Sequence, residues 1–294
     1  MTGTILVVGD IMTDIIVMPE GPLVRGSDRR AKIRSRPGGS GANQAVWLGA
    51  LGARVKFVAR VARADLEMSS AYFRAHKVEP LLAADDEAPS GVLVTILDAN
   101  GERSFLTDRG ANLNLQANDL QETLLDGVGL LVVSGYSFFT PGPRAAVMAL
   151  LAAAKARGIT TAIDPASVGF LREVGADNFL KWTGGCDMIF ANIDEALALT
   201  GSVDLNLQMQ TLGRVFSRVV IKRGDLGGAV GGRKTATVSL PAPHVEVVDT
   251  TGAGDAFAAG YLIEQMRGGS VEDCLRAGIA AGTEAVGQIG GQPA

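Results

Sequence analysis

Short apolar runs alternate with longer amphipathic segments along most of the chain. The apolar runs are continuous, which is typical of strands buried on both faces, and we expect strands at 4–8, 55–59, 130–134, 160–163, 188–190 and 218–221. Apolar residues at helical spacing lie between them and predict helices at 42–51, 66–75, 143–157, 193–199 and 207–216. Strands that alternate with helices indicate an α/β fold, with a mostly parallel sheet between two layers of helices.

The last third of the chain has a different order of elements. Two short runs, 228–231 and 234–238, flank a Gly-Gly-Arg turn and predict a hairpin, and helices are expected at 253–266 and 271–286. Four further stretches alternate apolar and polar residues, as half-exposed strands do: 11–17, 31–35, 91–98 and 103–107. They do not fit the buried core, and they form either a second, smaller sheet or edge strands and hairpins of the main sheet.

A glycine-rich turn precedes the helix predicted at 253–266. The turn Gly252-Ala253-Gly254 would hold the first free N–H groups of that helix, where backbone donors and the helix dipole favour an anion. Asp255 follows at once. A carboxylate beside a bound phosphate makes sense if it takes the proton of a hydroxyl that attacks the phosphoryl group. The alternative is an ordinary helix entry in which Asp255 only complements the dipole.

Composition and charge restrict the classes of function. With 294 residues and 47% hydrophobic residues, the chain can bury a large core in one large domain, or in one domain with a small appendage. The net charge of −4 and the absence of a long basic run indicate that nucleic acid is not a partner. The basic cluster 25–36 is either a solvated face or an attraction site for an anionic ligand.

The sequence also carries expectations about location and other ligands. No apolar stretch approaches the ~20 residues of a membrane helix, and the chain opens on a strand rather than a signal sequence, so we expect a cytoplasmic protein with no membrane partner. Two isolated cysteines and two distant histidines do not suggest a metal cluster. There is no Gly-x-x-x-x-Gly-Lys-Ser/Thr loop, and no Gly-x-Gly-x-x-Gly motif follows the first strand.

Two separate motifs carry a family resemblance. Residues 248–260 (VDTTGAGDAFAAG) and 38–52 (GGSGANQAVWLGALG) resemble the C-terminal and N-terminal signatures of the ribokinase-like (PfkB) carbohydrate kinase family, and further matching pieces run from 5–14 through 191–195 to 290–293. The resemblance implies a ribokinase-like open α/β/α sandwich as one domain over 1–294. In this family a small β-sheet lid covers the sugar site, which assigns the strands at about 11–17, 31–35 and 91–108 to a lid.

The resemblance also implies a reaction. It is the transfer of the γ-phosphoryl group of ATP to a hydroxymethyl group of a small sugar, with Asp255 as the base, Gly252, Ala253 and Gly254 as N–H donors, and Mg²⁺ bridging the phosphates. A nucleoside or pseudouridine acceptor is the alternative within the same class, because apolar and aromatic wall residues could stack on a base. A non-catalytic protein that senses a nucleotide or sugar is the alternative of another class.

Residue chemistry and the family resemblance together predict which residues contact the phosphoryl acceptor. Asp14 stands where relatives hold sugar hydroxyls with a carboxylate, whereas Asp10 is expected to be a turn or strand-end cap. The other expected acceptor contacts are Gly38, Gly39 and Asn43 from the N-terminal signature, and Arg109 and Tyr136 beyond it. Arg109 falls where kinases of keto-deoxy sugar acids carry a carboxylate-binding arginine, but the stretch 163–167 lacks their second arginine and resembles the neutral-sugar pattern.

The nucleotide residues lie near the ends of two predicted strands. Asn192 and Glu195, at i and i+3, match the family's Asn-x-x-Glu motif, which organises magnesium and phosphate, and read alone they would be a helix cap and its capping-box partner. Lys222 and Gly224 follow the strand 218–221, where relatives contact nucleotide phosphates and ribose. An ordinary solvated lysine is the alternative.

A monovalent cation is a further implication of the resemblance. The positions that supply its oxygens in ribokinase-like members match Asp249, Thr251, Ala285, Gln288 and Gly290, so K⁺ joins ATP and Mg²⁺ as an expected optional cofactor. Relatives often dimerise through lid strands, whose exposed edges need covering, and a homodimer through the lid is therefore an expectation too.

Overall fold

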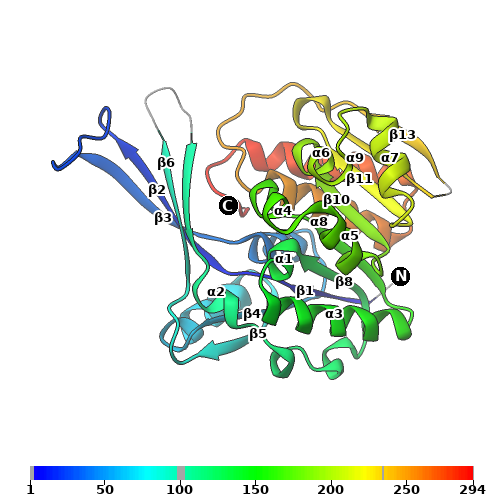
Figure 1. Cartoon of the computed structure of the whole chain (residues 1–294), viewed down its shortest axis with the longest axis horizontal. Helices are drawn as coiled ribbons and strands as arrows, with labels where there is room; N and C mark the ends of the chain where they lie inside the picture. Colours follow the sequence, from blue (N-terminus) through cyan, green and yellow to red (C-terminus); the bar gives the residue numbers. More distant parts are fainter. Residues whose placement is uncertain (1–2, 98–102, 234, 294) are drawn as a thin grey trace.

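The main sheet is mostly parallel, as the strand pattern predicts. A computed structural model describes residues 3–97, 103–233 and 235–293, and within them a nine-stranded sheet has the order β13-β12-β11-β10-β9-β8-β1-β4-β5 (Figure 1). The strands from β11 to β5 are parallel and β12 is antiparallel to both of its neighbours. Their bounds are β1 (Thr4–Val8), β4 (Val55–Ala62), β5 (Val78–Asp85), β8 (Val128–Ser134), β9 (Thr160–Asp164), β10 (Met188–Asn192), β11 (Arg218–Lys222), β12 (Gly228–Gly232) and β13 (Thr235–Leu240).

Helices cover both faces of this sheet, so the three-layer prediction is confirmed. Alternate residues of β1 point to opposite faces: Ile5 and Val7 pack in one core, whereas Leu6 and Val8 pack in the other. The first core lies against α1 (Ser40–Ala50), α2 (Leu66–Ala75), α8 (Ala253–Arg267) and α9 (Val271–Val286). The second lies against α3 (Pro141–Ala156), α4 (Val168–Val174), α5 (Ala176–Thr183), α6 (Ile193–Thr200) and α7 (Leu205–Leu212).

The structure adds elements that the sequence pattern did not predict. Strand β5 has a glutamate and a proline near its start, and it is tolerated because it is the edge of the sheet, where one side needs no partner. Helices α4 and α5 were also missed, because each spans only two turns. The helix expected at 207–216 begins and ends earlier, at Leu205–Leu212, since Gly213 follows as its C-cap.

The predicted hairpin and the two C-terminal helices are confirmed. Strands β12 and β13 pair antiparallel, and α8 and α9 follow within one residue of their expected bounds. The expected strand limits Asp98 and Lys234 lie outside the described residues. No helix of the described ranges is long and apolar enough to cross a membrane.

The four half-exposed strands form a separate sheet. Its order is β3-β2-β6-β7, with β2 (Met12–Pro19), β3 (Ala31–Gly38), β6 (Gly91–Leu97) and β7 (Arg103–Asp108). The alternative of edge strands on the main sheet is therefore wrong. In Figure 1 this small sheet stands to the left of the helical layers and projects beyond the main sheet. The basic cluster 25–36 lies on its exposed outer strand and in the preceding loop, as a solvated face does.

The pairing register assigns the two faces of the small sheet. Asp14 pairs with Leu93, and Leu93 with Thr107, so these side chains share one face, and Phe105 joins them by strand alternation. Ile33 and Leu106 point to the opposite face, where they are 65% and 61% exposed. The face with Asp14 is the one that takes part in the site described next.

Candidate active site

The candidate site lies at the edge of the main sheet where its parallel strands end. Asp164, Asn192 and Lys222 are the last residues of β9, β10 and β11, and Asp10 follows β1. Ligands of open α/β sheets bind at this carboxyl edge. A cavity of about 530 Å³ lies between this edge and the small sheet.

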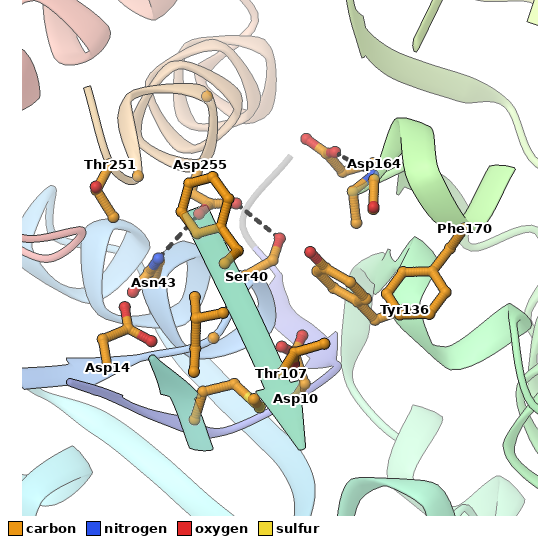
Figure 2. Close-up of a pocket in the computed structure, with 18 of the residues that line it drawn as sticks. Asp10, Asp14, Ser40, Asn43, Thr107, Tyr136, Asp164, Phe170, Thr251 and Asp255 are labelled. Carbon is orange, nitrogen blue, oxygen red and sulfur yellow. Dashed lines mark hydrogen bonds between the residues drawn. The ribbon is translucent and has the colours of Figure 1, made fainter. Parts of the chain in front are cut away.

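Asp255 is held by three side chains from the first turns of α1. Its Oδ1 accepts a hydrogen bond from Ser40 Oγ at 2.8 Å, and its Oδ2 accepts one from Asn43 Nδ2 at 3.0 Å (Figure 2). Oδ1 also accepts from Gln44 Nε2 at 3.1 Å. Asp255 itself is the third residue of α8. These bonds fix its carboxylate in the cavity, between the N-termini of two helices.

Close backbone contacts put α1 in reach of Asp255. A Cβ on Gly41 would lie 2.7 Å from the Cα of Gly9, so only glycine lets the helix start this near the end of β1. Asp10 then binds the helix through its side chain, because Oδ1 accepts from Gly41 N at 3.1 Å, and through its carbonyl, which accepts from Ala42 N. The expectation that Asp10 is a cap agrees with these bonds.

The N-terminus of α8 is open to an anion. The first backbone hydrogen bond of this helix runs from Ala256 N to Gly252 O, so the amides of Gly254 and Asp255 precede it. Gly252 takes a left-handed conformation with φ 72°, and a Cβ there would lie 2.4 Å from the Cα of Gly291. The C-terminal segment thus supports the turn, and Trp47 Nε1 donates to Gly291 O at 3.0 Å.

Burial makes Asp255 a weaker acid than an ordinary aspartate. Burial, with the negative charge of Asp164, raises the pKa of Asp255 from 3.8 to about 7, although Asn43, Lys222 and Ser40 oppose the shift. A group with this pKa exchanges protons near neutral pH, as a general base must. The electrostatics therefore suit the base role expected of Asp255.

Asp14 and Asn43 place two oxygens without partners in the cavity wall. Asp14 is 8% exposed, and neither its Oδ1 nor Asn43 Oδ1 accepts a hydrogen bond in the described structure. Burial, reinforced by Asp10 and Asp249, raises the pKa of Asp14 to about 7. Gly39 lines the cavity, whereas Gly38 lies behind Asp14 and leaves room for its carboxylate, since a Cβ there would meet Asp14 Oδ2 at 2.2 Å. Asp14 Oδ1 and Asn43 Oδ1 are therefore suited to accept hydrogen bonds from ligand hydroxyls.

Arg109 and Tyr136 form part of the opposite wall. Arg109 Nη1 donates to Asp10 Oδ2 at 3.2 Å, and its guanidinium lies 4.0 Å from the centre of the Tyr136 ring. Tyr136 also meets Phe170 edge-on at 5.9 Å. Burial raises the pKa of Tyr136 to about 12, so its hydroxyl stays protonated at neutral pH.

Lys222 lies in a cluster of acids beside α8. Its Nζ donates to Asp164 Oδ2 at 2.6 Å and would lie 3.1 Å from a Cβ on Gly254. Burial alone would lower the pKa of Lys222, but the charges of Asp164 and Glu195 raise it, so the ammonium stays charged. Asn192 and Glu195 form a reciprocal capping box at the start of α6, and burial raises the pKa of Glu195.

A second cavity, of about 580 Å³, adjoins the first. Asn192, Lys222 and Gly254 line both cavities, and Gly224 lines only the second. Much of the rest of the second wall is apolar, with Ala242, Pro243, Val245, Val247, Phe257, Ile279 and Val286, and its polar residues include Asp225, His244, Thr250 and Thr283. The two cavities therefore meet at the N-terminus of α8, where an anionic group could pass from a ligand in one to a ligand in the other.

Hydrogen bonds in the described structure connect only some of the residues expected to bind a monovalent cation. Asp249 Oδ1 accepts from the amide and the hydroxyl of Thr251, and its Oδ2 accepts from Gly290 N at 3.0 Å. Gln288 Nε2 donates to Gln292 O, and Ala285 O accepts from Gln288 N, as at a helix end. The cation therefore stays a prediction.

Sequence reasoning missed several residues of the site. Ser40 and Gln44 lie in a recognised motif but were not expected to hold Asp255. Asp164 ends a buried strand, as Asn192 and Lys222 do, and this shared position was the signal that could have identified it. Phe105 and Phe170 line the first cavity, and nothing in their sequence positions indicated this role.

The chain resembles known proteins over its whole length. A family model described as "pfkB family carbohydrate kinase" matches residues 2–294. The bifunctional protein HldE of Shewanella denitrificans is 28% identical over 97% of this chain, which spans 60% of the length of that relative. The ATP-dependent ribose-1-phosphate kinase of Halopiger xanaduensis is 26% identical over 91% of this chain and 87% of its own. The crystal structure of adenosine kinase from Sinorhizobium meliloti is 27% identical, with a TM-score of 0.88 and coverage of 100% and 96%.

The two ends of α8 offer a matched pair of glycine substitutions. Gly252 and Gly268 both have positive φ, but a Cβ on Gly268 meets nothing within 4 Å. We expect Gly268→Ala to lower the free energy of unfolding by about 1 kcal/mol, and Gly252→Ala to lower it by roughly 1–3 kcal/mol more, because the added carbon meets Gly291. Urea unfolding followed by circular dichroism measures both, and equal losses would contradict the contact with Gly291.

The buried carboxyl of Asp14 predicts a pH-dependent stability. Its pKa rises from 3.8 to about 7 on folding, so the folded state binds more protons between these values and loses stability as pH increases through that range. Asp14→Asn removes this loss, and its stability relative to wild type should therefore be higher at pH 8 than at pH 5.

Urea midpoints at the two pH values test the expectation for Asp14. Asp28→Asn, which removes a carboxylate from an exposed loop, is the matched control and should show a much smaller dependence on pH. A difference between Asp14→Asn and wild type that does not change with pH would show that the carboxyl of Asp14 is not desolvated on folding.

Proposed function

Because the chain belongs to the pfkB family of carbohydrate kinases, we propose that it transfers the γ-phosphoryl group of ATP to a hydroxymethyl group of a small sugar or nucleoside. The observation that carries this proposal is the meeting of two cavities at the N-terminus of α8, with Asp255 beside the junction. One cavity suits the acceptor and the other the nucleotide. The γ-phosphoryl group can then pass from ATP to the acceptor while each ligand stays in its own cavity.

Asp255 acts as the general base. The acceptor hydroxyl gives its proton to the Asp255 carboxylate as its oxygen bonds to the γ-phosphorus, and the bond from that phosphorus to the bridging oxygen of ADP breaks. The bonds from Ser40, Asn43 and Gln44 hold the carboxylate in one orientation. Its pKa of about 7 keeps it partly ionised at neutral pH and able to hold the proton.

The start of α8 receives the charge of the transferred group. The amides of Gly252 and Gly254 lie at the start of the helix, where the helix dipole adds positive potential. The expected donor Ala253 is not free for this role, because its N–H donates to Thr250 O at 3.3 Å. Lys222 adds a full positive charge beside Gly254. Asp14 and Asn43 accept hydrogen bonds from hydroxyls of the acceptor, and Arg109 and Tyr136 limit its far end.

The apolar walls of the second cavity suit a nucleotide base, and Lys222 and Gly224 lie toward its phosphates. The donor set at the junction fits Mg²⁺, because Asn192, Glu195 and Asp164 offer amide and carboxylate oxygens there. Mg²⁺ would neutralise phosphate charge. These residues would hold it largely through water, as the ion keeps much of its hydration shell.

The small sheet acts as a lid in this proposal. Its inner face supplies Asp14, Leu93, Phe105 and Thr107 to the acceptor cavity, so it covers the acceptor and excludes water that would otherwise hydrolyse ATP. Activation by K⁺ at Asp249 and its neighbours, a homodimer through the lid, a single kinase domain over 1–294 and a cytoplasmic location stay predictions.

Removing the base tests the proposal directly. We expect Asp255→Asn to lower kcat by about 10²–10⁴-fold, because the acceptor hydroxyl then has no group to take its proton. Acceptor-dependent ADP release from Mg·ATP, with sugars and nucleosides as acceptors, is the measurement. Asp194→Asn, which changes an exposed aspartate in the first turn of α6, is the control and should leave the rate unchanged.

Each result has a distinct meaning. Acceptor-dependent ADP release by wild type that disappears in Asp255→Asn excludes a purely sensing protein. Unchanged release in Asp255→Asn would contradict the assignment of the base. Binding of ATP without ADP release from any acceptor would favour the non-catalytic alternative.

The raised pKa of Asp255 predicts a pH dependence of the rate. The base must be ionised, so kcat/KM should fall as pH decreases through about 7. Burial raises the pKa of Glu195 and of Asp14 as well, and the residual activities of Glu195→Gln and Asp14→Asn separate these groups from Asp255. An acid limb near pH 7 that remains in both variants supports Asp255, and an acid limb near pH 4 in wild type would contradict the shift.

A further inference from the structure

The acceptor cavity has a polar side and an aromatic side. Figure 2 shows Asp14 and Asn43 on one side, Tyr136 and Phe170 on the other, and Asp255 and Ser40 between them. At about 530 Å³ the cavity is in the usual range for ligand pockets, and part of it, at Asn192, Lys222 and Gly254, is the junction with the second cavity. A ligand that fills it has hydroxyls at one end and an apolar body at the other.

Phe105 is the least covered aromatic ring in this cavity. It comes from β7 of the small sheet, lines the cavity and is 60% exposed. No aromatic contact of Phe105 with another ring is found in the described residues, in contrast to Tyr136 and Phe170. An exposed ring on the wall of a binding cavity is available to cover a planar apolar surface of the ligand.

The charges of the cavity favour an uncharged ligand. Two cations line it, and each already has a carboxylate partner: Arg109 with Asp10 at 3.2 Å and Lys222 with Asp164 at 2.6 Å. Three further carboxylates line it: Glu195 faces Mg²⁺ in the proposed function, whereas Asp14 and Asp255 have no cation partner in the described structure. Arg36 pairs with Asp14 in the sheet register, but its side chain is exposed and is not part of the lining. An anionic acceptor would therefore face a net negative wall.

Two buried oxygens on the polar side of the cavity indicate which ligand groups bind there. Among the residues that the structure describes, Asp14 Oδ1 and Asn43 Oδ1 have no hydrogen-bond partner, and a buried oxygen without one is costly unless a ligand donates to it. Hydroxyl groups supply such donors. The hydroxyls of a ribose could occupy these positions while its hydroxymethyl group faces Asp255.

Resting on the proposed function, we propose that the acceptor is an uncharged ribonucleoside, bound with its ribose at Asp14 and Asn43 and its base on the side of Phe105, Tyr136 and Phe170. The base replaces water on the exposed ring of Phe105. Asp10 neutralises Arg109, and the guanidinium supports the ring of Tyr136. Arg109 therefore does not bind a carboxylate or phosphate of the acceptor.

Three acceptors that share one ribose ring test the proposal. Ribose, ribose 1-phosphate and adenosine all carry the 5-hydroxymethyl group, but at C1 they carry a hydroxyl, an anion or a base. Cytidine provides a smaller base, and keto-deoxygluconate a carboxylate. Initial rates of ADP release with saturating Mg·ATP give kcat/KM for each. We expect a nucleoside to exceed both ribose and ribose 1-phosphate by about tenfold or more, as expected for stacking of one base.

The outcomes separate this inference from the proposed function. A nucleoside as the best acceptor supports both. A higher kcat/KM for ribose, ribose 1-phosphate or keto-deoxygluconate overturns the inference and leaves the kinase proposal in place. No ADP release from any acceptor contradicts the proposed function and, with it, this inference.

A matched pair of substitutions on one strand tests the role of Phe105. Phe105→Leu keeps an apolar side chain and removes the ring, so KM for the nucleoside should rise about tenfold with little change in kcat and no change in KM for ribose. Leu106→Ala is the control, because Leu106 is equally exposed at 61% but points to the other face of the sheet. Equal effects of Phe105→Leu on ribose and nucleoside, or no effect on either, would overturn the placement of the base.

Discussion

The set of hydrogen bonds between Asp255 and the first turns of α1 is the interaction on which the site depends. It joins the two signatures of the chain, which lie far apart in sequence, at one carboxylate. Two close backbone approaches make these bonds possible: Gly9 against Gly41 at the start of α1, and Gly252 against Gly291 at the start of α8. The orientation of the Asp255 carboxylate, the proposed base, is therefore set by the packing of both helices on the main sheet.

The balance of charge around that carboxylate follows from the topology of the sheet. Parallel strands bring their final residues to one edge, so Asp164 and Lys222 meet there and Glu195 lies just beyond Asn192. Burial, reinforced by the negative charge of Asp164, raises the pKa of Asp255 to about 7, and negative charges outnumber positive ones in the cavity. In our proposal the same excess, with the buried oxygens of Asp14 and Asn43, disfavours an anionic acceptor. One arrangement would thus both tune the proposed base and select the acceptor.

The sequence predicted the parts of the fold that repeat a simple pattern. The continuous apolar strands were predicted to within a few residues, because burial on both faces leaves a clear signal. Strand β5 was missed, since an edge strand tolerates a glutamate and a proline. In the site, the two glycine-rich motifs led to Asp255 and Asn43, and the ends of two predicted strands led to Asn192 and Lys222. Ser40 and Gln44 were not assigned a role, because their bonds to Asp255 depend on where α8 lies.

The family, the alternation of strands and helices, and the two glycine-rich motifs could be predicted from the order of amino acids, because these are local properties of the chain. The folded structure was needed to show that Asp10 pairs with Arg109, that Asp164 pairs with Lys222, and that Phe105 is exposed on the wall of the cavity. Each of these facts joins residues from different strands or sheets. Such contacts arise when the chain packs, and no spacing within one segment encodes them.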